Sequence, residues 1–209
     1  MLQAKGFRVT TSDPVRLFFG LGLDGELADG VARTARSAYG VDGEAYGADD
    51  LHLTLVFLGE RPAGDVGRLR ALGAPEFAGL HAPELVVRGE GGVFDGSADR
   101  PRAVWREVGE ARGTEGRLAA LRNRACQVGR MVGWRPRPAE AARTFRPHVT
   151  VARPRDPVQA TEGLARRGRD RAWLVPEVAL FASCTEKERA AGGGRYRILQ
   201  TWNLAVGPQ

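Results

Sequence analysis

Two short motifs of the same form, His-x-Thr, occur in the chain, one at His52 and Thr54 and one at His148 and Thr150. Each lies in a run of aliphatic and β-branched residues that is typical of a β-strand. Because residues i and i+2 of a strand point to the same face, each histidine shares a face with its threonine, and aliphatic side chains occupy the other. Each strand is therefore expected to bury one face and to present an imidazole beside a hydroxyl on the other.

Two imidazoles that face each other across a groove are well suited to acid–base chemistry at a phosphodiester. One neutral histidine can take a proton from an attacking oxygen, while the other, protonated, gives one to a departing oxygen. The hydroxyls of Thr54 and Thr150 can hold the non-bridging oxygens and stabilise the charge that develops there. A single His-x-Thr motif is common by chance, but two copies in equivalent contexts are far more specific.

A metal site is the weaker interpretation of these histidines. Two histidines without a third histidine, cysteine or carboxylate in register do not form a zinc site. The remaining histidine, His81, has no comparable context and is expected in a loop. Cys126 and Cys184 lie far apart without CxxC spacing, which favours a reduced, cytoplasmic protein. We expect no metal and no cofactor.

The segments around the two motifs repeat one order of elements: strand, helix, strand with His-x-Thr, helix, strand. In the first half the pattern predicts strands at 15–23, 51–57 and 84–94 and helices at 25–39 and 64–72. In the second half it predicts strands at 103–108, 147–153, 178–183 and 196–206 and helices at 115–132 and 157–167. Asp24 is the expected N-cap of the first helix. Two copies of one α+β unit, related by a pseudo-two-fold axis, account for this order and bring the two histidine strands together.

The 209 residues are expected to form one bilobal domain over 15–209, preceded by an extension at 1–14. The composition, 43% hydrophobic and 27% charged, is ordinary for a globular protein and excludes wholesale disorder. No apolar run approaches the roughly 18–20 residues of a membrane span. The first residues of the sequence lack the apolar segment of a secretory signal. We therefore expect no membrane partner.

The charge balance has two explanations. The chain carries 31 basic residues against 25 acidic ones, a net charge of +6, which is typical of a protein that binds phosphates. Only Lys5 and Lys187 are lysines, so arginine supplies the rest of the basic residues. Such richness in arginine, glycine and alanine is also what a GC-rich genome imposes, and composition alone leaves both explanations open.

The sequence resembles the two-histidine phosphoesterase superfamily and, within it, the bacterial and archaeal RNA 2′,3′-cyclic phosphodiesterases, also called 2′-5′ RNA ligases or LigT-like proteins. The residues that carry the resemblance are RLFF at 16–19, LHLTLVFLGE at 51–60 and FRPHVTVAR at 145–153, with further matches at 101–105, 178–183 and Tyr196. The resemblance covers roughly 15–206. It implies a LigT-like α+β fold with the active-site groove between two antiparallel sheets.

The resemblance also implies roles for single residues. His52 matches the general acid that protonates the departing 3′-oxygen, and His148 matches the base that activates water. Thr54 and Thr150 match the hydroxyls that hold the phosphate.

Further ligand contacts are implied five residues after each histidine, at Phe57 and Arg153. Phe57 is suited to stack on a nucleobase, and Arg153 to clamp a phosphate. Simple strand alternation puts both on the face away from the histidines. They reach the groove only where the strand ends, twists or bulges after the threonine.

The implied function is hydrolysis of RNA 2′,3′-cyclic phosphate ends to 2′-phosphomonoesters in RNA processing, with reversible ATP-independent 2′-5′ ligation through the same groove. The expected partner of this monomer is RNA with such an end, tRNA fragments included. The alternatives are a non-catalytic RNA-end binding protein and a phosphodiesterase acting on a small cyclic phosphate or a 2′-5′ oligonucleotide. The loop at 185–195, with three consecutive glycines at 192–194, is interpreted as a tolerated insertion rather than a lid.

Overall fold

The computed structural model describes residues 14–23, 25–40, 45–94, 103–154, 156, 162–163 and 168–207. Its strands are β1 (Val15–Gly22), β2 (His52–Arg61), β3 (Glu84–Phe94), β4 (Ala103–Glu110), β5 (His148–Ala152), β6 (Arg171–Leu174), β7 (Glu177–Ser183) and β8 (Tyr196–Asn203). Its helices are α1 (Gly25–Tyr39), the 3₁₀ helix η1 (Ala48–Asp50), α2 (Gly64–Phe77), α3 (Arg117–Met131), α4 (Pro138–Ala141) and α6 (Glu186–Ala190). The predicted extension up to residue 13, the predicted cap Asp24 and most of the predicted helix at 157–167 lie outside the described residues.

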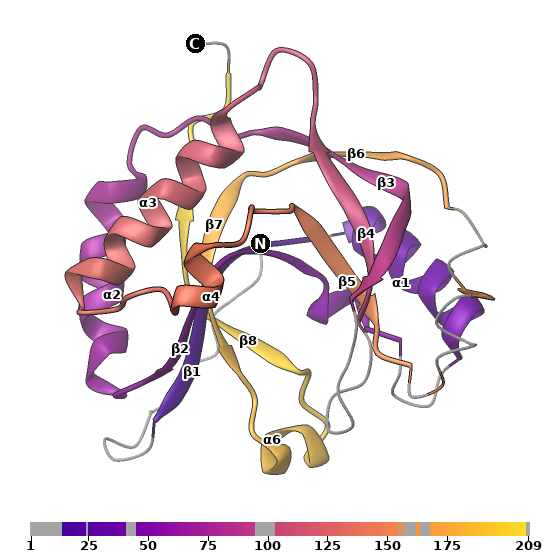
Figure 1. Ribbon diagram of the computed structural model, residues 1–209, viewed down its shortest axis with the longest axis horizontal. Helices are drawn as coiled ribbons and strands as arrows, with labels where there is room; N and C mark the ends of the chain where they lie inside the picture. The colour runs from indigo at the N-terminus through magenta and orange to yellow at the C-terminus, as the bar shows by residue number, and fades with distance from the viewer. Residues whose placement is uncertain are drawn as a thin grey trace.

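The strands form one eight-stranded antiparallel sheet in the order β6-β3-β4-β5-β2-β1-β7-β8 (Figure 1). The two histidine strands, β2 and β5, lie side by side at its centre. They are joined by a single residue pair, Leu53 with Val149, whereas every other neighbouring pair of strands is joined by at least four residue pairs. The α+β fold is therefore confirmed, and the two sheets expected from the sequence are two halves of one sheet that meet at this joint.

The two lobes on either side of the joint do not correspond to the two halves of the sequence. The first lobe consists of β8, β7, β1 and β2 with α2 and α3, and the second of β5, β4, β3 and β6 with α1 (Figure 1). Strand β3, from the first half of the chain, pairs with β4 in the second lobe, while β7 pairs with β1 in the first. Each lobe is thus built from both halves of the sequence.

The hydrophobic core lies between the sheet and the helices. Helix α1 turns one side toward the sheet, and its residues Ala28, Val31, Ala32, Ala35 and Tyr39 are buried, as the helical spacing predicts. Helix α3 buries Leu118, Leu121, Ala125 and Val128 in the same way. Leu53 and Val149, at the central joint, are both fully buried. The apolar faces of the two histidine strands are therefore packed into the core.

The segment at 185–195 is not the plain loop expected from its glycines. Thr185 caps α6, because its hydroxyl accepts a hydrogen bond from the Glu188 amide and the Glu188 carboxylate accepts one from the Thr185 amide at 2.6 Å. This is the capping box that Ser/Thr-x-x-Glu sequences form.

Two further differences concern elements that the sequence signals weakly. Strand β6 was not predicted, since only Trp173 of its four residues is buried and no alternation develops over so short a run. Helix α2 continues past residue 72 to Phe77, whose ring is fully buried. No helix in the described residues is long and apolar enough to cross a membrane.

Candidate active site

Both histidine strands carry a bulge directly after the threonine. Thr54 pairs with β1, the next pair begins at Val56, and the intervening residue has no partner. In β5, Thr150 pairs with β4 and the next pair begins at Ala152, again with one residue unpaired. An extra residue of this kind reverses the alternation of side chains along the rest of the strand. The position five residues after each histidine is thereby turned to the histidine's own face.

Phe57 shows the result of the first bulge. It pairs with Phe18 of β1, and the Phe18 ring lies 5.6 Å from the Phe57 ring and 4.8 Å from the His52 ring, centroid to centroid. Phe57 is 49% exposed, an unusual fraction for so large an apolar ring. It therefore lies on the groove face beside His52, with area open to a ligand.

Arg153 follows the second bulge and reaches toward the first lobe. Its Nε donates a hydrogen bond of 2.9 Å to the hydroxyl of Tyr46. The ring of Tyr46 lies 6.4 Å from that of Tyr196, which in turn lies edge-on to His52 at 4.6 Å. The structure therefore brings Arg153, from the end of β5, to the His52 side of the groove.

The His52 ring is held in an aromatic pocket of the first lobe. It is 7% exposed and contacts Phe18, Phe181 and Tyr196. Its Nδ1 lies 2.8 Å from the carbonyl oxygen of Asp50. Since a carbonyl only accepts hydrogen bonds, Nδ1 carries the hydrogen and Nε2 is left with the lone pair in the neutral ring. Burial, with a smaller contribution from the charge of His148, lowers the pKa of His52 to about 4, although the hydrogen bond to the Asp50 carbonyl opposes this shift.

The His148 ring lies in the second lobe in a more open position. It is half-buried, edge-on to Phe94 at 4.9 Å and to Trp105 at 6.0 Å. Its Nδ1 lies 2.7 Å from the carbonyl oxygen of Arg146, so the same tautomer is fixed as in the first lobe. Burial lowers the pKa of His148, and the positive charge of Arg146 adds to this effect.

The two threonines are available to a ligand. Thr54 and Thr150 are half-buried, and in the described part of the chain neither hydroxyl bonds to another protein group. Because each shares a face with its histidine, a phosphate held between the imidazoles would meet a hydroxyl from each lobe. Hydroxyl donors so placed can stabilise negative charge on phosphate oxygens.

Asp50 is a residue of the site that the sequence argument missed. Its carbonyl orients His52, and its carboxylate Oδ1 accepts hydrogen bonds from the backbone amides of Arg195 at 2.6 Å and Tyr196 at 3.3 Å. Burial raises the pKa of this carboxyl group, and the two amide bonds oppose the rise. Asp50 therefore ties His52 to the start of β8, which supplies the Tyr196 ring. Its position two residues before the histidine is the signal that could have identified it.

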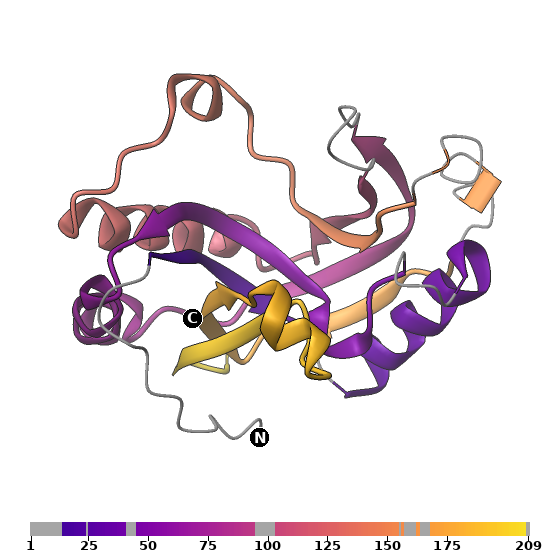
Figure 2. The same cartoon turned by 90° about the horizontal axis from the view of Figure 1, so that it is seen from below.

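Arg146 occupies the matching position in the second lobe. It ends the connection from α3 through α4 to β5, which arches away from the sheet (Figure 2). Its guanidinium lies over the Trp105 ring, 5.4 Å from the centroid. Trp105 itself pairs with Thr150 across the sheet, so strand pairing places this aromatic ring on the groove face. Within the residues that the structure describes, no group of three or more His, Cys, Asp or Glu is arranged to hold a metal ion.

Comparison with known proteins gives whole-length similarities. No family model matches the sequence. The RNA 2′,3′-cyclic phosphodiesterase of Escherichia coli strain K12 is 29% identical over 197 residues, which cover 92% of this chain and 98% of that protein. The crystal structure of E. coli LigT complexed with 3′-AMP is similar with a TM-score of 0.64 and 25% identity, covering 92% of this chain and 99% of that one. A crystal structure of a Thermus thermophilus protein has a TM-score of 0.62 and 25% identity, over 90% and 97% of the two chains.

Proposed function

This chain belongs to the LigT-like family of two-histidine phosphoesterases, and from that premise we propose that it hydrolyses the 2′,3′-cyclic phosphate ends of RNA to 2′-phosphomonoesters. The observation that carries the proposal is the repeated arrangement at the groove. Each lobe supplies an imidazole whose Nδ1 is fixed by a backbone carbonyl two residues earlier, and each supplies a threonine hydroxyl beside it. The E. coli relative is named for the same reaction.

The reaction needs one proton to be taken and one to be given. A neutral imidazole removes a proton from water at its free Nε2, and the water oxygen forms a bond to phosphorus. The bond from phosphorus to the 3′-oxygen breaks, and the second, protonated imidazole gives its proton to that oxygen. The 2′-ester is retained, and Thr54 and Thr150 hold the two non-bridging oxygens while charge builds on them.

The pKa order of the histidines bears on which one is the acid. The resemblance assigns the acid to His52 and the base to His148. Without bound substrate, however, the more deeply buried His52 is neutral above a pH of about 4. An anionic phosphate beside an imidazole raises its pKa. His52 can therefore act as the acid only when the bound substrate raises its pKa enough for His52 to hold the proton.

The lining of the groove supports a nucleotide rather than a simple phosphate ester. Phe57 offers an exposed ring beside His52, and base–aromatic stacking is typically worth about 1–3 kcal/mol per base. Arg153 carries a planar guanidinium that can donate two parallel hydrogen bonds to a phosphate. A non-catalytic RNA-end binding protein would need stacking and charge but no proton donor. The presence of both complete His-x-Thr pairs favours the enzyme.

The test is to incubate the purified protein, in EDTA, with an oligonucleotide that ends in a 2′,3′-cyclic phosphate and to identify the product end. We expect a 2′-phosphomonoester. A 3′-phosphomonoester would contradict the proposed breaking of the bond from phosphorus to the 3′-oxygen. Activity that EDTA abolishes and a divalent metal restores would contradict the two-histidine mechanism. Tight binding without turnover would favour the non-catalytic alternative, and turnover of cyclic mononucleotides alone would favour a small-molecule substrate.

A further inference from the structure

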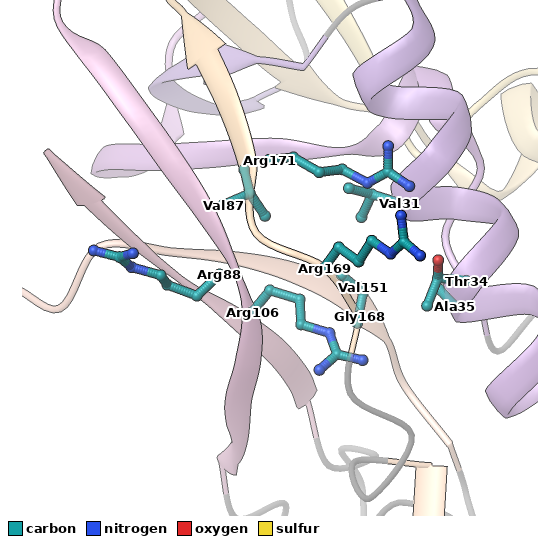
Figure 3. Close-up of a pocket in the computed structure, with 10 residues that line it drawn as sticks. All are labelled: Val31, Thr34, Ala35, Val87, Arg88, Arg106, Val151, Gly168, Arg169 and Arg171. Carbon is teal, nitrogen blue, oxygen red and sulfur yellow. The ribbon is translucent and has the colours of Figure 1, made fainter. Parts of the chain in front are cut away.

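A pocket rich in arginine lies on the opposite face of the sheet from the two histidines, beneath α1 (Figure 3). Neighbouring residues of a strand point to opposite faces. In β4, Trp105 faces the groove and contacts His148, so Arg106, the next residue, faces the α1 side. The residues that line the pocket are Val31, Thr34, Ala35, Val87, Arg88, Arg106, Val151, Gly168, Arg169 and Arg171. This pocket is therefore separated from the proposed catalytic groove by the sheet itself.

Three of the four guanidinium groups lie on the side of the pocket nearer α1. Figure 3 shows Arg169 and Arg171 pointing toward the helix, with Arg106 below them, while Arg88 points away from the others. Arg88 is paired with Asp170 at 2.9 Å. Arg106 is 5% exposed and is held by a hydrogen bond of 2.5 Å from its Nη1 to the Gly89 carbonyl. One arginine is thus built rigidly into the pocket wall.

Arg171 is accommodated by a gap in the helix surface. A Cβ added at Gly30 of α1 would lie 2.8 Å from the guanidinium carbon of Arg171, so a larger residue there would displace this side chain. Thr34, one turn further along α1, lines the same space, and its hydroxyl donates to the Gly30 carbonyl at 2.9 Å. The helix therefore presents a small polar surface to the arginines rather than an acidic one.

Two of the arginines in the pocket, Arg169 and Arg171, have no acidic partner among the described residues. None of the described residues that line the pocket is a carboxylate, and in the described ranges Arg169 and Arg171 make no ion pair or hydrogen bond with a protein group. The positive charges of Arg169 and Arg171 repel one another, and a multidentate anion such as a phosphate group relieves this repulsion. The buried apolar side chains of Val31, Val87 and Val151, from α1, β3 and β5, complete the walls.

We propose that this pocket binds a phosphate group in addition to, and apart from, the phosphate at the two histidines. The space is about 350 Å³, a volume that includes the part open to solvent. Phosphate of this kind can come from a free nucleotide or from the backbone of an RNA chain. Because the sheet lies between the pocket and the groove, one phosphate cannot occupy both.

The experiment is an NMR titration of the uniformly ¹⁵N-labelled protein with three probes: pyrophosphate, ADP and a ten-nucleotide RNA without a cyclic end. We expect saturable shifts of the backbone amides at Val31, Val87 and Val151. ADP binding with no RNA effect at these amides identifies a free nucleotide as the source, and RNA that competes with pyrophosphate there identifies the RNA backbone. Probes that shift only groove amides, such as those of His52 and Tyr196, would overturn the proposal.

Two double variants distinguish binding at this pocket from a general effect of the protein's positive charge. Arg169→Ala with Arg171→Ala, both at exposed residues, should weaken pyrophosphate binding at the pocket amides about tenfold or more. Arg33→Ala with Arg36→Ala removes the same charge from the exposed side of α1 and should change it less than about threefold. Equal losses in the two double variants would overturn the proposal.

A further variant, Thr34→Glu, places a carboxylate among the arginines and should abolish binding without removing a basic residue. Retained binding in this variant would count against the pocket. Hydrolysis of a cyclic mononucleotide should be unchanged in the Arg169/Arg171 variant, so failure of this proposal and failure of the proposed catalytic function give different results.

Discussion

The two histidine strands share a backbone arrangement but differ in their surroundings. Both have a bulge after the threonine and a carbonyl, two residues before the histidine, that fixes the imidazole. In the first lobe that carbonyl belongs to Asp50, which is buried and bonded to the chain at Arg195 and Tyr196. In the second it belongs to Arg146, which is exposed and rests on Trp105.

The difference shows how a duplicated site assigns unlike tasks to like residues. Two identical imidazoles in identical surroundings would share one pKa, and neither would be favoured as acid or base. Deeper burial of His52 separates its pKa from that of His148, and separated pKa values are the usual sign of distinct acid and base roles. The backbone arrangement that the two lobes share fixes the orientation of each imidazole. The side chains that differ between the lobes give the two imidazoles different pKa values and therefore different roles.

The largest expected effect comes from removing either imidazole. His52→Ala and His148→Ala should each lower turnover of a cyclic-ended RNA by about 10²–10⁴-fold, the usual contribution of one positioned proton-transfer group. A p-nitrophenyl phosphodiester, whose leaving group needs no proton, should then distinguish the two lobes. The variant that lacks the acid should recover most of its activity on this ester, and the variant that lacks the base should not. Equal recovery of both variants would show that the lobes do not divide the roles.

Loss of a threonine hydroxyl should have the next largest effect. Thr54→Ala and Thr150→Ala should each reduce kcat by about 10–10³-fold, since each removes a donor that stabilises charge on the phosphate oxygens. Ser at either position keeps the hydroxyl and serves as the matched control. A Ser variant as impaired as the Ala variant would indicate that packing of the threonine methyl, not the hydroxyl, is what matters.

Asp50 should have a smaller effect, confined to the first lobe. Asp50→Ala leaves the carbonyl that fixes His52 but removes the acceptor for two buried amides, so kcat should fall about tenfold and stability by about 1–3 kcal/mol. Asp50→Asn keeps one acceptor oxygen and should restore most of the loss. A positioning role also predicts a changed NMR titration of the His52 ring in Asp50→Ala, and an unchanged titration would leave Asp50 as a purely structural residue.

The smallest expected effect is a displacement of the pH profile. Both imidazole pKa values are lowered, that of His52 to about 4, and the singly protonated enzyme is most abundant between the two values. The profile of kcat/KM should therefore be bell-shaped with its maximum below the ordinary histidine pKa of about 6.5. It falls on the acid side as the base gains a proton, and on the alkaline side as the acid loses one. A maximum well above 7 would contradict this order.

The periodicity of the sequence was sufficient to predict most helices and strands, but it did not predict the strand face on which each side chain lies. Helix α1 and strand β3 begin and end where the pattern predicts, because long amphipathic or apolar runs are set by local spacing. Alternation alone would have put Phe57 and Arg153 on the wrong face, since the bulges depend on pairing with other strands. Asp50 was missed because its partners lie about 145 residues away along the chain. The Thr-x-x-Glu pattern of a capping box is present at Thr185, but a loop was predicted because three glycines follow it.

The exchange of strands between lobes has a consequence for how the chain folds. Strands β1 and β2 come early in the sequence, but the strands that complete their lobe, β7 and β8, come last. A ribosome must therefore release the chain as far as β8 before the first lobe can close, and as far as β6 before the second can close. Pairings between such distant segments slow folding, because the entropy of closing long loops is lost before the contacts form. The nascent chain thus carries open strand edges until β8 has been synthesised, and open edges of this kind are the surfaces that make incompletely folded chains prone to aggregate.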